Sequence, residues 1–288
     1  MKQGIKTIFL LLVLTVILLG AGFLVGLWLG ISPSIAISGA FALAMLLNFT
    51  VYWKSHEWVL KLHGAEILDE EDKPELHRML EKLAENAGLP KPRLAVVEDE
   101  RPNAFATGRN PENSVVAVTT GLLDNMKEDE IEGIMGHELA HIKNRDMLVN
   151  TMAAMIAGSI AYLGMMGRFS MLFGRRRGKG GVLAIIALIM LPIAAAIVRM
   201  SISRSREYGA DEEGVEISGN PAALANALER IQEITEKESK SKRRRGSKEG
   251  NPATSHMYIY NQFSGGGIAK LFSTHPPVEE RVKRLRDM

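Results

Sequence analysis

The most prominent pattern along the chain is a long apolar stretch near its beginning. No charged residue occurs from Thr7 to Trp53, a run of 47 positions. One membrane-spanning helix needs about 20 apolar residues, so this run is long enough for two. We expect helices over about Thr7–Gly30 and Pro33–Trp53, since Pro33 suits the first turn of a helix. The pattern therefore predicts a transmembrane helical hairpin over residues 1–53.

Two shorter uncharged runs follow later in the chain, Met147–Gly167 and Gly180–Val198. Both are close to the minimum length for crossing a bilayer. They predict a second hydrophobic helical pair over residues 147–200. This pair divides a charged, polar domain into two parts, residues 54–146 and residues 201–288.

The link between these two later runs is strongly basic. Five positive charges on the far side of the membrane would oppose the positive-inside rule. The second pair therefore either spans the bilayer despite these charges or forms a hairpin that does not fully cross, and the sequence leaves both open. The residues concerned are Arg168, Arg175, Arg176, Arg177 and Lys179.

Basic residues also occur at both ends of the first hairpin, which lie on the same side of the membrane. Lys2 and Lys6 precede the hairpin, Lys54 follows it, and its internal link contains neither Lys nor Arg. The positive-inside rule then places the N-terminus and the polar domain in the cytoplasm of a multi-pass protein. The apolar run extends past Leu29 and exceeds the core of a cleaved signal peptide, so we expect a retained anchor.

The first part of the polar domain alternates between helical and extended patterns. Leucines at helical spacing predict an amphipathic helix over Asp72–Ala87. Short β-branched runs predict three strands, and the Gly108–Pro111 turn suggests that the last two form an antiparallel hairpin. A further helix begins with three acidic residues at 128–130, which suit the positive end of the helix dipole. The predicted strands are Arg93–Val97, Ala104–Thr107 and Val115–Thr119.

The second part of the polar domain is expected to be helical over Ser201–Ser218 and Ala222–Glu236. The stretch Thr235–Gly250 is rich in Lys, Arg, Glu, Ser and Gly, which predicts a mobile surface loop. The chain contains no cysteine, so neither a disulfide nor a thiolate metal site is available. Any metal ion must be held by His, Asp or Glu.

The helix that begins near residue 128 carries the pattern His-Glu-x-x-His at 137–141. On a helix, His137 and His141 lie one above the other, so both imidazoles can reach one metal ion. Glu138 is rotated from them and can meet a metal-bound water without being a ligand. Two surface histidines on an ordinary helix would give the same pattern. The helical periodicity and the small residues Gly133 and Gly136 favour the metal site.

A catalytic zinc needs a third protein ligand and one open position. Glu207 and Asp211 lie four residues apart on a predicted helix, so their carboxylates share a face. One could bind the metal while the other orients a ligating histidine. An alternative is that both pair with Arg204 and Arg206 on a helix surface, and the spacing favours neither. Two hydrophobic passes between His141 and Glu207 would return the chain to the same membrane face.

Together these motifs resemble the HtpX heat-shock membrane proteases, which are related to the CAAX prenyl proteases. The resemblance covers nearly the whole chain and rests on several motifs in the same order. They are RPNAFATG at 101–108, TGLL at 120–123, GHELAH at 136–141, SRSREYGAD at 203–211 and FSTHPPVEER at 272–281. The implied fold is α+β and mostly helical, with four hydrophobic helices and a zincin-like metalloprotease domain carrying a small β-sheet.

The resemblance implies one Zn²⁺ per chain, with Glu207 as its third ligand and Asp211 behind a ligating histidine. It implies that Glu138 is the general base and that His275 lies near the metal as a possible oxyanion donor. It also implies an edge strand for peptide substrates and places Arg281 near the peptide path. The expected substrate-binding residues of that strand are Asn103, Ala104 and Phe105.

The implied function is quality control of misfolded or damaged membrane proteins in a prokaryotic cell membrane. Polypeptides and the lipid bilayer are the expected partners, a homo-oligomer is possible, and no nucleic-acid partner is expected. Three alternatives compete with this function. A prenyl-specific protease needs a larger membrane chamber, and a transporter usually needs charges inside the membrane. A pseudoprotease is disfavoured by the intact Glu138.

Overall fold

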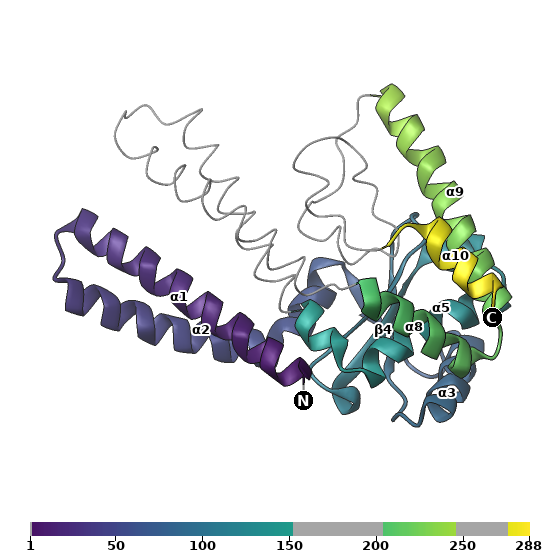
Figure 1. The fold of residues 1–288 in the computed structure, drawn as a ribbon, viewed down its shortest axis with the longest axis horizontal. Helices are drawn as coiled ribbons and strands as arrows, with labels where there is room; N and C mark the ends of the chain where they lie inside the picture. Colours follow the sequence, from purple (N-terminus) through teal and green to yellow (C-terminus); the bar gives the residue numbers. More distant parts are fainter. Residues whose placement is uncertain (1, 152–203, 246–275) are drawn as a thin grey trace.

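The computed structural model describes residues 2–151, 204–245 and 276–288. Helices α1 (Lys2–Leu29) and α2 (Pro33–Leu62) form a hairpin that projects from the rest of the molecule (Figure 1). The N-terminus lies at the base of this hairpin, and the turn between its helices lies at the far tip. Large apolar side chains point outward from both helices, among them Leu12 and Phe49. This outward apolar surface is typical of contact with lipid.

Within the described ranges, one segment is long and apolar enough to cross a membrane, Pro33–Lys54 of α2. The corresponding apolar segment of α1, Thr7–Gly20, is shorter. The chain is helical again over residues 146–151, but the predicted third and fourth hydrophobic helices fall outside the described residues. A membrane anchor is therefore supported by α2, while the prediction of four hydrophobic helices stays a prediction.

Helix α2 continues nine residues past the predicted end at Trp53, and this prediction was too short. The charged residues after Trp53 end the apolar run without ending the helix. Val59 and Leu60 are buried against the β-sheet, where they pack with Phe105. Burial of this last part of α2 stabilises the continued helix and joins the hairpin to the polar domain.

A four-stranded sheet lies at the centre of the polar domain, with the strand order β1-β2-β4-β3. The expected antiparallel pairing of β3 with β4 is confirmed, and β2 runs parallel to β4. Strand β1 was not predicted, because three residues are too few for a periodic pattern to emerge. The strands are β1 (Ala65–Ile67), β2 (Arg93–Val97), β3 (Ala104–Gly108) and β4 (Ser114–Thr119).

Both faces of this sheet are covered. Along β4, Val116 and Val118 contribute to the larger core, while Val115 and Ala117 face the cluster that includes the end of α2. The larger core continues into α3 (Pro74–Ala87) and α5 (Glu128–Lys143). A short helix α4 (Thr120–Asn125), also not predicted, follows β4 directly, and a 3-10 turn (Pro111–Asn113) connects β3 to β4.

The remaining described helices are α8 (Arg204–Ser218), α9 (Pro221–Arg245) and α10 (Val278–Arg286). Helix α8 lies across α5, and α10 packs beside α9 (Figure 1). Helix α9 extends into the stretch predicted as a loop, Thr235–Gly250, which is helical as far as Arg245. Lys, Arg and Glu are good helix formers, so high charge did not exclude a helix there. The α+β, mostly helical class is confirmed.

Candidate metal centre

The candidate site lies where α5 and α8 cross, and two glycines allow their backbones to approach closely. A Cβ atom added to Gly214 would lie 2.8 Å from both the backbone N and the Cα of His137. A Cβ at Gly136 would lie 2.8 Å from the carbonyl oxygen of Gly214. Any larger residue would therefore separate the helices. This contact brings Glu207 of α8 opposite His137 and His141 of α5.

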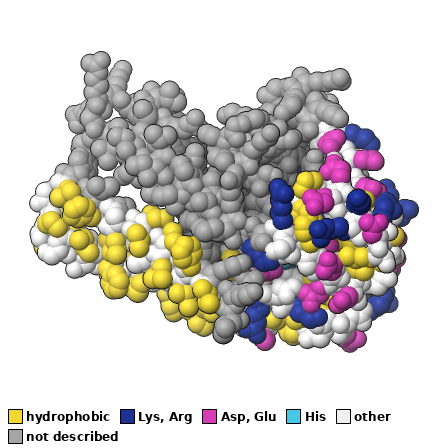
Figure 2. All heavy atoms as spheres, viewed as in Figure 1, with side chains coloured by type: hydrophobic (Ala, Val, Ile, Leu, Met, Phe, Trp, Pro, Cys, Tyr) yellow, Lys and Arg dark blue, Asp and Glu magenta, His cyan; other side chains and the backbone are white. Residues whose placement is uncertain are grey.

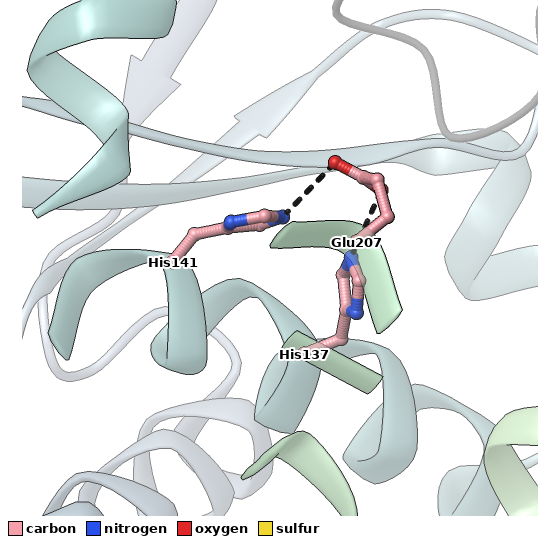
Figure 3. A group of neighbouring side chains, drawn as sticks. All are labelled: His137, His141 and Glu207. Atoms are coloured by element: carbon pink, nitrogen blue, oxygen red, sulfur yellow. Dashed lines mark ion pairs between the residues drawn. The ribbon is translucent and has the colours of Figure 1, made fainter. Parts of the chain in front are cut away.

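Three side chains converge in this crossing (Figure 3). Glu207 reaches over the two imidazoles, with its Oε2 3.9 Å from His137 Nε2 and its Oε1 3.7 Å from His141 Nε2. One ligand atom from each residue lies within 4.8 Å of the others, and all three residues are buried. The spacing argument left the partner of the histidines open, and the structure brings Glu207 to them.

This donor set fits a divalent metal ion. With metal–ligand bonds of about 2.0–2.2 Å, atoms around a tetrahedral ion lie roughly 3.4 Å apart. The separations of 3.7 Å and 3.9 Å are a few tenths of an ångström longer and need small side-chain adjustments. Buried ionisable groups are normally paired or bind a metal ion. The buried Glu207 carboxylate faces the Nε2 atoms of two histidines, and a metal ion between them would satisfy all three groups.

Asp211 lies on the far side of His137, as the resemblance implied. Its Oδ1 is 3.0 Å from His137 Nδ1, a position that fixes the ring with Nε2 facing Glu207. Arg281 of α10 holds this carboxylate with two hydrogen bonds, donating from Nε to Oδ2 at 2.8 Å and from Nη2 to Oδ1 at 2.6 Å. Burial raises the pKa of Asp211, but Arg281 and, to a smaller extent, His137 outweigh burial and lower this pKa to about 2.

Asp146 has the equivalent position behind the other histidine, and sequence reasoning missed it. Its Oδ2 lies 3.4 Å from His141 Nδ1, and Arg206 Nη1 lies 3.2 Å from its Oδ1. Burial lowers the pKa of His141, but Asp146, Glu207 and Glu138 together raise it to about 9. The one available signal was an acid placed directly before the Met147–Gly167 run. Each histidine thus has an aspartate behind it and an arginine behind the aspartate.

The side chain of Glu138 extends from α5 to strand β3. The Ala106 backbone N–H donates a hydrogen bond of 2.8 Å to Glu138 Oε2. Ala106 is opposite Val116 in the β3–β4 ladder, so its N–H faces the edge of the sheet that β4 does not use. The carboxylate is therefore held at the free edge of β3, and Glu138 directly follows His137 of the candidate metal site.

The other predicted substrate residues lie on or next to the same edge strand. Asn103 and Ala104 are buried, and the Phe105 side chain lies in the sheet core, 5.0 Å from the His63 ring. What the strand offers a peptide is backbone, since side chains alternate between the sheet faces. Arg281 is fully buried behind Asp211, and its role in substrate binding stays a prediction. His275 lies outside the described residues.

The chain is similar to several known proteins. The Protease HtpX homolog of Pyrococcus furiosus is 50% identical over 286 residues, which cover 98% of this chain and 94% of that protein. The Protease HtpX homolog of Persephonella marina is 46% identical, with 99% of this chain and 96% of that protein covered. The crystal structure of S. mikatae Ste24p aligns with 99% of this chain and 65% of its own, at a TM-score of 0.49 and 17% identity.

The model of Peptidase family M48 matches residues 70–288, which include every described residue of the candidate metal centre. The helical hairpin, which precedes this match, lies within the nearly full-length similarity to the HtpX homologs. The resemblance derived from the motifs is confirmed. The chain belongs to peptidase family M48, and it is a membrane-associated metalloprotease.

Proposed function

We propose that this protein is a zinc-dependent endopeptidase of a prokaryotic cell membrane that hydrolyses misfolded or damaged membrane proteins. The observation that carries the proposal is the convergence of His137, His141 and Glu207 beside the edge-held Glu138. Ligand chemistry supports zinc, because two imidazoles and one carboxylate form a common catalytic zinc set and leave one position open. The single cluster of this kind among the described residues supports one ion per chain.

The bound ion would supply Lewis acidity, which lowers the pKa of water and polarises the scissile carbonyl. Glu138 accepts a proton from the attacking water and passes it to the leaving amine. The hydrogen bond from the Ala106 N–H supports this role, since it fixes the carboxylate where a peptide along β3 would lie. Asp211 and Asp146 hold the two imidazole rings in the orientation that directs Nε2 at the ion.

Substrate binding in this proposal is addition of a strand to β3. The edge backbone of Ala104 and the C=O of Ala106 can pair with any peptide sequence, which suits broad specificity, while the Ala106 N–H is already donated to Glu138. Asn103 and Phe105 then act by fixing the strand rather than by touching the substrate. Arg281 acts through Asp211, and His275 as oxyanion donor is a further part of the proposal.

The proposal places the catalytic domain on the cytoplasmic side of a multi-pass protein. The basic residues Lys54 and Lys61 at the end of α2 support this orientation. An active site at the base of a membrane hairpin suits substrates that emerge from the bilayer. An unfolded chain can supply the extended segment that a strand-addition site requires.

The experiment that tests the function is digestion of casein by purified protein, with Glu138→Gln as the variant and a chelator in a parallel reaction. We expect wild-type activity that the chelator removes and added zinc restores. Glu138→Gln should keep zinc but lose more than about 100-fold in turnover, because the water loses its proton acceptor. Near-normal turnover in Glu138→Gln would rule out this carboxylate as the base, and chelator-resistant wild-type activity would rule out the metal.

A further inference from the structure

A polar hollow lies where α2 meets the sheet. It has a volume of about 360 Å³ and is formed by the end of α2, the start of β2 and the turn between β3 and β4. None of the metal-centre residues lines it. Its cationic and aromatic lining residues are Trp53, Lys54, His56, Lys91, Arg93 and Arg109.

The depth of this hollow matches the headgroup layer of a membrane. The membrane-length segment of α2 ends at Lys54, and His56 follows two residues later. At about 1.5 Å per helical residue, His56 lies only about 3 Å beyond the end of that segment. The headgroup layer on each side of the hydrocarbon core is roughly 5–7 Å thick. In Figure 2 the outward apolar side chains of the hairpin give way to charged ones at its junction with the polar domain.

The charge of the lining is positive, with four cationic side chains against the carboxylates of Glu57 and Glu112. Two of the cations are already paired, because Lys54 lies 2.7 Å from Glu57 and Lys91 lies 2.8 Å from Glu70. The remaining two, Arg93 and Arg109, have no ion pair with any described residue. An anion entering the hollow would meet these two guanidinium groups.

Arg109 is positioned by the aromatic residue at the membrane boundary. Its guanidinium carbon lies 4.3 Å from the centroid of the Trp53 ring. A guanidinium stacked on a ring keeps its N–H groups free along its edge, where they can bind two oxygens of a phosphate. Trp53 itself is of the residue type that sits at the membrane–water interface.

His56 also lines this hollow. Its side chain is 8% exposed, and its Nδ1 is buried without a hydrogen-bond partner among the described residues. Burial lowers the pKa of His56; Glu57 opposes this shift, and Arg93, Arg109 and Lys54 add to it. His56 therefore adds no positive charge at neutral pH, and the guanidinium groups of Arg93 and Arg109 carry the charge that faces an anion.

We infer that this hollow binds the phosphate of an anionic phospholipid headgroup, with Arg93 and Arg109 as its protein partners. The depth relative to the membrane favours a lipid over free phosphate, which shares the same oxygen chemistry. Basic pockets at the cytoplasmic ends of membrane helices bind such headgroups. Because Arg109 directly follows strand β3, a bound headgroup would also tie that strand to the membrane surface.

The test is binding of soluble short-chain lipids to the detergent-solubilised, zinc-loaded protein at constant ionic strength. The probes are dihexanoyl phosphatidylglycerol, dihexanoyl phosphatidylcholine and inorganic phosphate. We expect the phosphatidylglycerol to bind at least about tenfold more tightly than either other probe. The double variant Arg93→Gln/Arg109→Gln should lose at least about tenfold of that affinity, because it lacks both charge-assisted contacts.

A matched control removes two exposed positive charges elsewhere, Arg78→Gln/Lys283→Gln, and should bind phosphatidylglycerol like the wild type. Casein digestion by each variant reports that the protein is folded. Unchanged binding in the Arg93→Gln/Arg109→Gln variant would overturn the site. Equal affinity for phosphatidylcholine would overturn the selectivity for anionic lipid. Equal affinity for inorganic phosphate would overturn the lipid as the source of the ligand.

Discussion

In two places in this protein, two helices pack closely against each other at a glycine. The two close contacts have different consequences. In the hairpin, a Cβ at Gly22 of α1 would lie 2.3 Å from the Cβ of Ala40 in α2. In the polar domain, a Cβ at Gly214 of α8 would lie 2.8 Å from the backbone of His137 in α5. Small residues at a helix interface allow the backbones to pack closely in lipid and in water alike.

The difference lies in what the helices present around the contact. The hairpin presents apolar side chains outward, where lipid can surround them, and glycines of α1 meet alanines of α2 at its contact, Gly22 with Ala40 and Gly26 with Ala36. The α5–α8 pair instead buries the ionisable His137, His141 and Glu207 at its crossing. Burying ionisable groups is unfavourable unless they are paired or bind a metal. Close packing is therefore a structural device in the first pair and a means of assembling a site in the second.

The largest effect is expected from filling the α5–α8 contact. Gly214→Ala adds a methyl group 2.8 Å from the His137 backbone, so the helices must separate and Glu207 must move away from the histidines. A displacement of about 1 Å can cost about 100-fold in rate. Casein digestion should fall by at least that factor, and zinc content should fall with it.

The matched control for this prediction is Gly209→Ala on the same helix. A Cβ at Gly209 would meet no described atom within 4 Å, so activity and zinc content should stay near the wild-type values. Equal losses in both variants would mean that α8 is sensitive to replacement of any of its glycines, whatever the space around them. Full activity in Gly214→Ala would contradict the claim that close approach assembles the site.

The next largest effect is expected from removing Arg281, the positive charge that pairs with Asp211. Arg281→Met leaves the buried carboxylate without its bidentate partner, and breaking a buried ion pair costs roughly 3–5 kcal/mol. Thermal unfolding should occur at a clearly lower temperature, and zinc affinity should fall by about 10–100-fold as His137 loses its orientation. Zinc competition with a chromophoric chelator measures the second quantity.

Arg286→Met on the same helix is the comparison for Arg281→Met. Arg286 pairs with Glu229 at 2.8 Å, but both side chains are about half exposed at 47%, and such pairs contribute about 0–1 kcal/mol. Its unfolding temperature and zinc affinity should change little. A similar loss in the two variants would show that α10 is sensitive to any lost charge.

A smaller effect is expected from pH, through His141. Its pKa is raised to about 9 in the folded chain, from an ordinary value of 6.5. The protonated ring therefore stabilises the metal-free protein below pH 6.5, and this contribution is lost as the pH rises towards 9. In a chelator, the unfolding temperature should fall across this window. Zinc affinity should rise across it, because the ion displaces the proton. A flat unfolding temperature in chelator would contradict the pKa shift.

The smallest effect on catalysis is expected in the hairpin. Gly22→Ala forces α1 and α2 apart at Ala40 and should lower thermal stability in detergent, since overpacking costs roughly 1–3 kcal/mol. Zinc content and digestion of a soluble unfolded substrate should be unchanged. Gly20→Ala, whose Cβ would meet no described atom within 4 Å, is the control. Loss of zinc in Gly22→Ala would show that the two helix pairs are coupled.

The sequence predicted the parts of this molecule that local patterns determine. The strand Arg93–Val97 and the amphipathic helix before it follow from short-range periodicity, and the pair His137 and His141 follows from one helical turn. Strand β1 was too short to carry a pattern. The extension of α2 depended on burial of Val59 and Leu60 against a distant sheet, which no local pattern records.

The parts of the site that could not be predicted depend on contacts between residues far apart in the chain. Arg206 meets Asp146 across 60 residues, and Arg281 meets Asp211 across 70. No local sequence pattern links Asp146 to Arg206 or Asp211 to Arg281, so neither pair could be predicted. Glu207 was placed as a ligand by the family resemblance, because spacing alone left it equal to a surface ion pair. Gly133 and Gly136 left room for close approach, but the sequence did not identify their partners, which are Leu224 of α9 and Gly214 of α8.

The central claim is that α5 and α8 together hold one metal ion, and zinc content per chain of the Glu207→Ala variant tests it most directly. Glu207→Ala should purify with almost no zinc and no activity, because two imidazoles alone do not form a catalytic set. Glu212→Ala removes an exposed carboxylate from the same helix and should keep one zinc per chain. One full equivalent of zinc in Glu207→Ala, measured by elemental analysis of folded protein, would contradict the account.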